Sequence, residues 1–132
     1  PEQRKLLPAV IRPITDPRYL AYVRRSLSEH GPMPPAQEAR MLEAMAVWNE
    51  TMGRSLADAL ASGPVVVVAG MGHMLYDAGI LESVRSRSGA IQRVVLPYPM
   101  DGTKKPAEEL LRALKDPASD DIQLADYFWL NP

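Results

Sequence analysis

Cysteine is absent from this 132-residue chain. Its absence excludes disulfide bonds, thiolate catalysis, thioether-linked prosthetic groups and cysteine-based zinc sites, although it does not identify a compartment. A long apolar run is missing as well, because the most apolar segment, Val65 to Met71, is far shorter than the roughly 20 residues that a membrane-spanning helix needs. We therefore expect no transmembrane segment.

An excess of basic residues is also lacking. Lysine and arginine number 15 against 16 aspartates and glutamates, for a net charge of -1. Since no global basic field can hold a phosphate backbone, we expect no nucleic-acid partner. Hydrophobic residues make up 46% of the chain and charged residues 23%, which is typical of a soluble globular protein long enough to bury a sizeable core.

The beginning of the chain lacks an initiator methionine, and no signal peptide is visible in it. Residues 1–7 pass directly from polar to apolar, as the middle of a domain does. We expect the sequence to be part of a longer protein.

Prolines divide the first half of the chain into two predicted helices. An Asp-Pro pair at residues 16–17 begins the first, because aspartate can cap free backbone amides and proline at the first helical position has none to leave unpaired. A Gly-Pro pair at residues 31–32 ends it. A longer helix is predicted over residues 35–61, and residues 8–15 form an extended connector.

The longer helix carries methionine, tryptophan and leucine on one face. Spacings of three or four residues keep these side chains in one stripe, which usually packs into a core. Alternatively, part of the stripe walls an apolar ligand pocket, because methionine adapts to flat, irregular shapes. The stripe consists of Met41, Met45, Trp48, Met52, Leu56 and Leu60.

The second half of the chain alternates predicted strands and helices. Residues 65–69 form a β-branched run without polar alternation, which predicts a strand covered on both faces. A parallel neighbour is predicted at residues 91–96, a last strand at residues 125–130, and helices at residues 79–87 and 104–115. This alternation is typical of parallel βαβ units, so the predicted fold class is α/β.

We predict that residues 1–132 form a single, incomplete α/β domain. Residues 1–62 would be a helical insert, and residues 63–132 would hold the βαβα units and the last strand. Such a unit is expected to be part of a larger three-layer domain. The apolar stripes of the insert should pack on each other or on a partner chain.

The segment after the first predicted strand holds the residues with the clearest chemistry. The carboxyl end of a parallel strand faces the ligand crevice, and Gly70 and Gly72 there permit close backbone approach or unusual dihedral angles. They would present His73, whose imidazole can bind metal, move protons or pair with an acid. A tight turn with an incidental histidine explains the pattern equally well. Without further glycines or a Gly-Lys-Ser/Thr motif, dinucleotide and phosphate-loop sites are excluded.

Three segments carry a resemblance to a known family. The block Trp48–Met52 (Trp-Asn-Glu-Thr-Met), the turn Gly70–His73 after a valine run, and the ending at residues 125–129 resemble the second half of ChaN-like haem-binding uptake proteins of the Tiki superfamily. Two Gly-x-x-His elements mark that superfamily, and Gly70–His73 is similar to the second. The first, with its acidic residue, belongs to an N-terminal half that this sequence does not contain.

The resemblance implies a non-enzymatic haem-binding protein of iron and haem uptake. It implies a periplasmic or outer-membrane-associated protein, often a lipoprotein, whose partners are haem or a similar flat apolar ligand and a second copy of the chain. Haem iron would be held by tyrosine or histidine. The candidates are first His73 and Tyr76, then His30 and Tyr22, with Gly70 and Gly72 beside the cofactor.

Two other functions remain open beside haem binding, which needs an apolar slot, an axial ligand and cations for two propionates. The cations could come from Lys104-Lys105 or from Arg85 and Arg87. A metal-assisted hydrolase, as in the Tiki and erythromycin-esterase types, needs about three protein ligands, for which the chain offers two histidines with Glu50 and Asp77. A ligand-free interaction domain is the third hypothesis.

Overall fold

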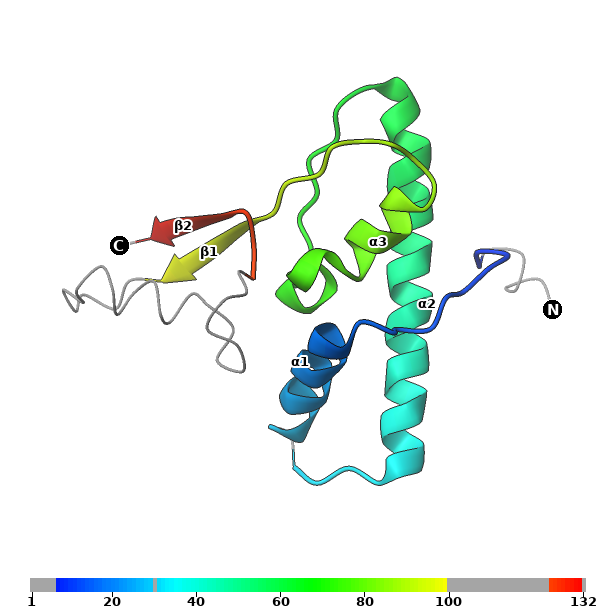
Figure 1. The fold of residues 1–132 in the computed structure, drawn as a ribbon, viewed down its shortest axis with the longest axis vertical. Coiled ribbons are helices and arrows are strands. Elements are labelled where there is room, and N and C mark those ends of the chain that lie inside the picture. The colour runs from blue at the N-terminus through cyan, green and yellow to red at the C-terminus, as the bar shows by residue number, and fades with distance from the viewer. Residues whose placement is uncertain (1–6, 30, 100–123, 132) are drawn as a thin grey trace. The chain divides into compact units, whose positions relative to one another are not determined.

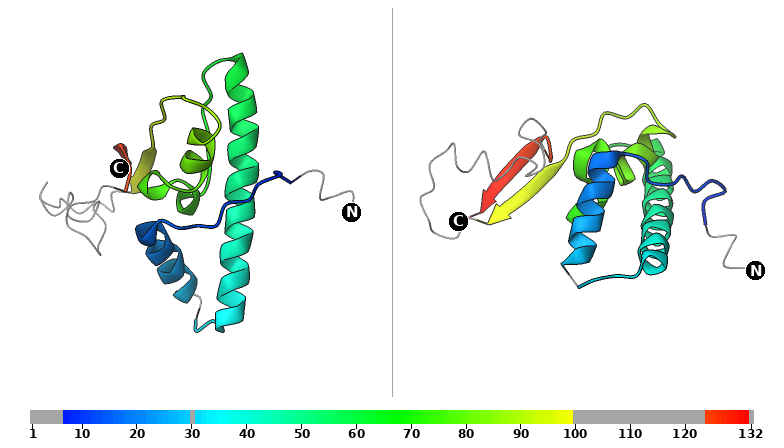
Figure 2. Two further views of the ribbon diagram at one scale, coloured as in Figure 1. Left: turned by 45° about the vertical axis from the view of Figure 1, so that its right-hand side comes forward. Right: turned by 60° about the horizontal axis from the view of Figure 1, so that its bottom comes forward.

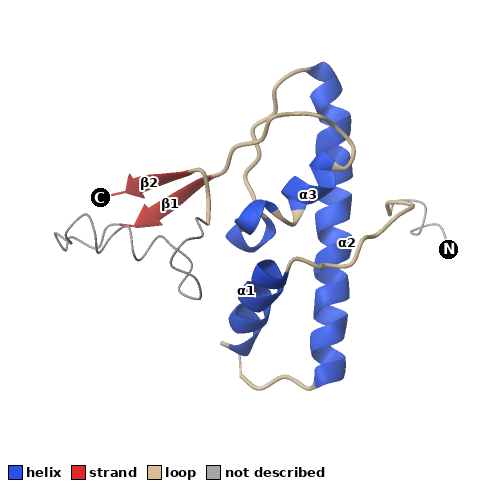
Figure 3. Ribbon diagram, in the orientation of Figure 1, coloured by secondary structure: helices blue, strands red, loops and turns tan. Residues whose placement is uncertain are grey.

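The computed structural model of the protein describes residues 7–29, 31–99 and 124–131. The chain forms two compact units, residues 1–90 and residues 91–132 (Figure 1). The described part of the first contains three α-helices and short turns, and that of the second contains two parallel strands (Figure 3). This mixture of helix and parallel strand agrees with the predicted α/β class.

Helix α1, Pro17–Ser28, begins where the Asp-Pro pair predicts. The Asp16 carboxylate accepts hydrogen bonds from the backbone amides of Arg18, at 2.9 Å, and Tyr19, at 3.1 Å. These bonds satisfy two of the amides that the first helical turn leaves free. The helix buries Tyr19 and Val23.

Helix α2, Pro35–Ala59, continues into a short 3-10 turn, Leu60–Ser62, and confirms the long predicted helix. Its Met/Trp stripe is not its buried face. Trp48 is 61% exposed and Met41 is 44% exposed, so the core-packing interpretation is wrong for these two residues. The residues that α2 buries are instead small or polar: Ala46, Asn49, Glu50 and Gly53.

A close helix contact explains this buried face. Helix α3, Ile80–Arg85, packs against α2, and the two lie side by side in both views of Figure 2. A Cβ atom on Gly53 would lie 2.2 Å from Ser83 Oγ and 2.4 Å from Ser83 Cβ. Only a residue without a side chain allows this approach. The face of α2 that meets α3 is therefore made of small and polar residues, and the Met/Trp stripe lies on another face of the helix.

The predicted strand at residues 65–69 is wrong. These residues form neither helix nor strand, and Val66 and Val68 are 93% and 97% exposed. A strand is stable when its backbone amides and carbonyls pair with a neighbour, and the described residues of the first unit include no other strand. The predicted ladder between residues 65–69 and 91–96 is therefore not formed.

The second unit contains β1, Val95–Pro99, and β2, Tyr127–Asn131, paired in parallel with Val95 opposite Tyr127. The last predicted strand is thus confirmed, and the strand predicted at residues 91–96 starts four residues later, at Val95. The Asp126 carboxylate accepts a 2.8 Å hydrogen bond from the Val94 amide just before the ladder, which helps to fix its register.

Three predictions on the fold stay predictions. The helix at residues 104–115 lies outside the described residues. The larger three-layer domain and the division at residue 62 are not tested by these two units. Within the described ranges, no helix combines the length and the hydropathy that crossing a membrane requires.

Candidate functional site

His73 closes a short 3-10 turn, Met71–His73, that follows the exposed valine segment. Its imidazole is half-buried, and its Nδ1 atom lies 2.7 Å from Oδ1 of Asn49 on α2. Burial lowers the pKa of His73 below its ordinary value of 6.5, because the charged form loses hydration. The ring is therefore neutral near pH 7, the form in which imidazole binds metals.

Apolar side chains reach the surface beside His73. The ring of Trp48 lies 5.9 Å from the imidazole, centroid to centroid, at an interplanar angle of 41°. Trp48 and Met71 are 61% and 46% exposed. Met45 lies three residues before Trp48 and Met52 four residues after it, so both share its face of α2, and both are half-buried. The alternative interpretation of the stripe, as a wall for an apolar ligand, agrees with this placement.

Behind the imidazole lies a buried polar pair, Tyr19 and Asn49, to which the sequence analysis assigns no role. The Asn49 amide Nδ2 donates to the hydroxyl of Tyr19 at 3.1 Å, and that hydroxyl donates to the carbonyl of Gly72 at 2.6 Å. Tyr19 is 1% and Asn49 4% exposed. Burial raises the pKa of Tyr19, so its phenol keeps its proton. In the sequence, the signal for Asn49 is its place in the Trp48–Met52 block that carries the family resemblance.

The two glycines of the turn, Gly70 and Gly72, do not have the unusual dihedral angles that glycine permits. Gly70 has ordinary dihedral angles, and a Cβ atom there would meet only His73 Cδ2, at 3.7 Å. At Gly72 a Cβ atom would meet Tyr22 Cε1 at 3.8 Å. The position that requires glycine is Gly79, where φ is +63° and a Cβ atom would lie 2.4 Å from the carbonyl oxygen of His73. A role of Gly70 and Gly72 beside a cofactor stays a prediction.

Tyr76, the other first-ranked candidate ligand, has different neighbours. Its side chain is 4% exposed, with the ring of Tyr22 6.3 Å away edge-on and the guanidinium of Arg18 5.9 Å from its ring centre. Tyr76 and Asp77 both adopt left-handed backbone angles, with φ of 57° and 60°. Such angles cost a bulky residue energy and collect at functional turns. Tyr76 is thus the less accessible of the two candidates.

A polar cleft of about 310 Å³ opens beside this turn. Its two arginines already have acidic partners: Arg18 pairs with Asp16 at 2.7 Å, and Arg85 pairs with Asp77. A propionate in the cleft would have to compete with these carboxylates. The cleft is lined by Thr15, Asp16, Arg18, Tyr76, Asp77, Ala78, Glu82 and Arg85.

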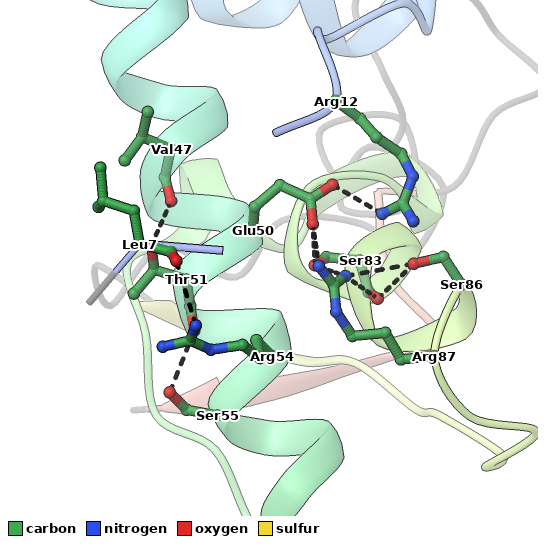
Figure 4. A network of polar contacts seen from close by, with 10 residues as sticks. All are labelled: Leu7, Arg12, Val47, Glu50, Thr51, Arg54, Ser55, Ser83, Ser86 and Arg87. Atoms are coloured by element: carbon green, nitrogen blue, oxygen red, sulfur yellow. Dashed lines mark hydrogen bonds and ion pairs between the residues drawn. The ribbon is translucent and has the colours of Figure 1, made fainter. Parts of the chain in front are cut away.

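Glu50 anchors a second buried network, between α2 and α3 (Figure 4). Its carboxylate accepts hydrogen bonds from Arg87 at 2.6 Å, Arg12 at 2.8 Å and Ser83 at 3.0 Å. Burial alone would raise the pKa of Glu50, but these three hydrogen bonds outweigh it and lower the pKa. Glu50 and Arg87 are therefore occupied in holding the helices together, which leaves Arg87 poorly suited to bind a propionate.

The other predicted contributors cannot be placed. His30 and the pair Lys104-Lys105 lie outside the described residues. Among the residues that are described, no three histidine, aspartate or glutamate side chains gather where they could hold a metal ion. The hydrolase hypothesis stays a prediction.

Comparison with known proteins adds one finding. No curated protein and no solved structure is significantly similar to this chain. Residues 1–84 match a protein family described as haem-binding uptake, Tiki superfamily, ChaN. The matched part includes Tyr19, Asn49 and the Gly70–His73 turn. Since it covers well over half of the 132 residues, the chain belongs to the ChaN haem-binding uptake family of the Tiki superfamily.

Proposed function

We propose that this protein binds haem through Nε2 of His73 and serves haem uptake without catalysing a reaction. One observation carries the proposal: a neutral, half-buried imidazole lies beside the exposed ring of Trp48. Haem has an iron that accepts a lone pair and a flat macrocycle that needs apolar cover. His73 can supply the lone pair, and the exposed ring of Trp48 can supply the apolar cover.

The donor set fits haem in two of three respects. His73 provides a neutral nitrogen, and Trp48 and Met71 provide exposed apolar area next to it. Methionine and tryptophan both adapt well to the face of a flat aromatic ligand. For the propionates, Arg18 and Arg85 are near the turn but paired with acids. A propionate would therefore have to displace a carboxylate from one of these arginines.

A periplasmic or outer-membrane location, a lipid anchor and a homodimer belong to the same proposal. The uptake role in the family description supports the location. The exposed Val66 and Val68 support a further covering layer, either a second copy or the rest of a three-layer domain.

A hemin titration tests the proposal. The parent protein should shift the Soret band of hemin saturably, and His73→Ala should weaken binding by at least about tenfold, equivalent to roughly 1.4 kcal/mol. His30→Ala, at the only other histidine, is the matched control and should bind like the parent. Because the pKa of His73 is lowered, binding should persist as the pH falls past 6.5 before a proton displaces the iron.

Two outcomes would contradict the proposal. A parent protein that leaves the Soret band unchanged does not bind haem. A His73→Ala variant with parental affinity assigns the iron to another residue, and a selective loss in His30→Ala would identify that residue as His30.

A further inference from the structure

Three hydrogen bonds form a chain that starts and ends at neighbouring residues. The carbonyl of Gly72 accepts from the Tyr19 hydroxyl at 2.6 Å, and the Tyr19 oxygen accepts from Asn49 Nδ2 at 3.1 Å. Asn49 Oδ1 lies 2.7 Å from Nδ1 of His73. The chain thus links α1, α2 and the 3-10 turn, and its two ends lie on consecutive residues of that turn.

The direction of each bond follows from what its groups can donate. The Gly72 carbonyl can only accept, so the Tyr19 hydroxyl gives it its single proton. The Tyr19 oxygen then accepts, which turns the NH₂ group of Asn49 toward it and leaves the Asn49 oxygen facing His73. An amide oxygen can only accept, so the proton of this bond must be on Nδ1 of His73.

A neutral imidazole carries one proton. With that proton on Nδ1, the lone pair of His73 is on Nε2, and the hydrogen bond made by one ring nitrogen decides which nitrogen is free to bind. The supporting groups are well fixed, because Tyr19 and Asn49 are 1% and 4% exposed. Gly79 leaves room for them, since a Cβ atom there would lie 3.1 Å from the Tyr19 hydroxyl.

We propose that Asn49 and Tyr19 are positioning residues that hold His73 in its Nδ1–H tautomer, so that Nε2 is the nitrogen offered to a bound ligand. The tautomer follows from the hydrogen-bond geometry alone. That the ligand is haem rests on the proposed function. The two parts can therefore fail separately.

The tautomer can be measured without any ligand. In protein with ¹⁵N-labelled histidine, long-range proton–nitrogen correlation spectra at about pH 8 distinguish a protonated ring nitrogen from one with a lone pair. The chain has only two histidines, so the spectrum of His73→Ala identifies the signals of His73. We expect Nδ1 of His73 to be protonated in the parent protein.

Variants then separate positioning from mere packing. Asn49→Leu removes both hydrogen bonds at similar volume and should shift His73 toward the Nε2–H form, whereas Asn49→Asp keeps an acceptor for Nδ1 and should retain the parental tautomer. Tyr19→Phe leaves the Asn49 amide free to turn over and should give a mixture. Tyr22→Phe, one helical turn along α1, is the matched control and should leave the tautomer unchanged.

Haem affinity gives a second readout. Asn49→Leu should weaken hemin binding by about 10- to 100-fold, as loss of an outer partner of a ligating histidine does elsewhere. Should the parent show the Nδ1–H tautomer but bind no hemin, the proposed function fails and the positioning stands.

The positioning is overturned if His73 of the parent is protonated on Nε2. It is also overturned if a folded Asn49→Leu protein, checked by circular dichroism, keeps the parental tautomer. Where Asn49→Leu does not fold, Tyr19→Phe decides, and a parental tautomer in that variant counts against the proposal.

Discussion

Replacing Gly53 by alanine tests the close contact between α2 and α3. In an exposed helix interior this change would stabilise the protein by about 0.5–1 kcal/mol, because alanine is the better helix former. Here the added Cβ atom would lie 2.2 Å from Ser83 Oγ and 2.4 Å from Ser83 Cβ, well inside van der Waals contact. Ser83 Cβ is bonded directly to the backbone of α3, so a change of the Ser83 rotamer cannot relieve the clash.

The cost follows from two losses. Forcing one extra carbon into a packed contact costs about 1–3 kcal/mol. Displacing the Ser83 hydroxyl also strains its 3.0 Å hydrogen bond to Glu50. Weakening a hydrogen bond to a charged group costs about 1 kcal/mol or more. After subtraction of the gain in helix propensity, we expect Gly53→Ala to lower the free energy of unfolding by about 2 kcal/mol.

Urea denaturation measures this loss as a lower midpoint with an unchanged slope. Gly89→Ala is the matched control, since nothing lies within 4 Å of its added Cβ atom, and it should stay within about 0.5 kcal/mol of the parent. The double variant Gly53→Ala/Ser83→Gly should lose less stability than the sum of the losses in the two single variants, because it lacks the Ser83 Cβ atom that clashes. A Gly53→Ala protein as stable as the parent would refute the helix contact.

Three further variants test other parts of the first unit. Glu50→Gln leaves two arginines without their carboxylate and should cost about 2–3 kcal/mol, against little change for the exposed Glu43→Gln. Because the folded-state pKa of Glu50 is lowered, its contribution is full above about pH 4.5 and is lost as the pH falls through the lowered pKa, so stability–pH curves of parent and variant should converge in acid. Asp16→Ala should cost about 1 kcal/mol in thermal unfolding, and Asp16→Asn much less, if the carboxylate acts as a helix cap. His73→Ala should cost about 1–2 kcal/mol, since it leaves the buried Asn49 oxygen without its donor; no change would mean that this bond is absent in solution.

Local chemistry made the helices predictable. Proline at a first helical position, aspartate before it and glycine after the last turn act within a few residues, so α1 and α2 begin where their sequences indicate. That residues 65–69 form no strand could not be predicted in the same way. A β-branched run states a preference, but a ladder needs a neighbouring strand that the run itself does not specify.

The candidate site was predicted only in part, for a related reason. The Gly70–His73 turn could be found because its residues are contiguous, and the histidine does lie near the Met/Trp stripe. Its buried partners come from two different helices. Tyr19 precedes Gly72, whose carbonyl it contacts, by 53 residues, and Asn49 precedes His73 by 24 residues. Contacts of that range depend on how α1 and α2 pack, and helix periodicity alone predicted the wrong buried face for α2.

The exposed valines have a consequence for the behaviour of the protein in the cell and in the test tube. Residues Val65–Val68 are uncharged, β-branched and exposed, which are the properties of segments that stack into cross-β aggregates. Pro64, directly before this segment, has no backbone amide to donate to a growing strand ladder and so protects its N-terminal side. Its C-terminal side lacks such protection, because the next charged residue is Asp77. Preparations in which this segment is uncovered should form thioflavin-positive fibrils, and Val66→Lys should suppress them, since residue 66 contacts mainly solvent.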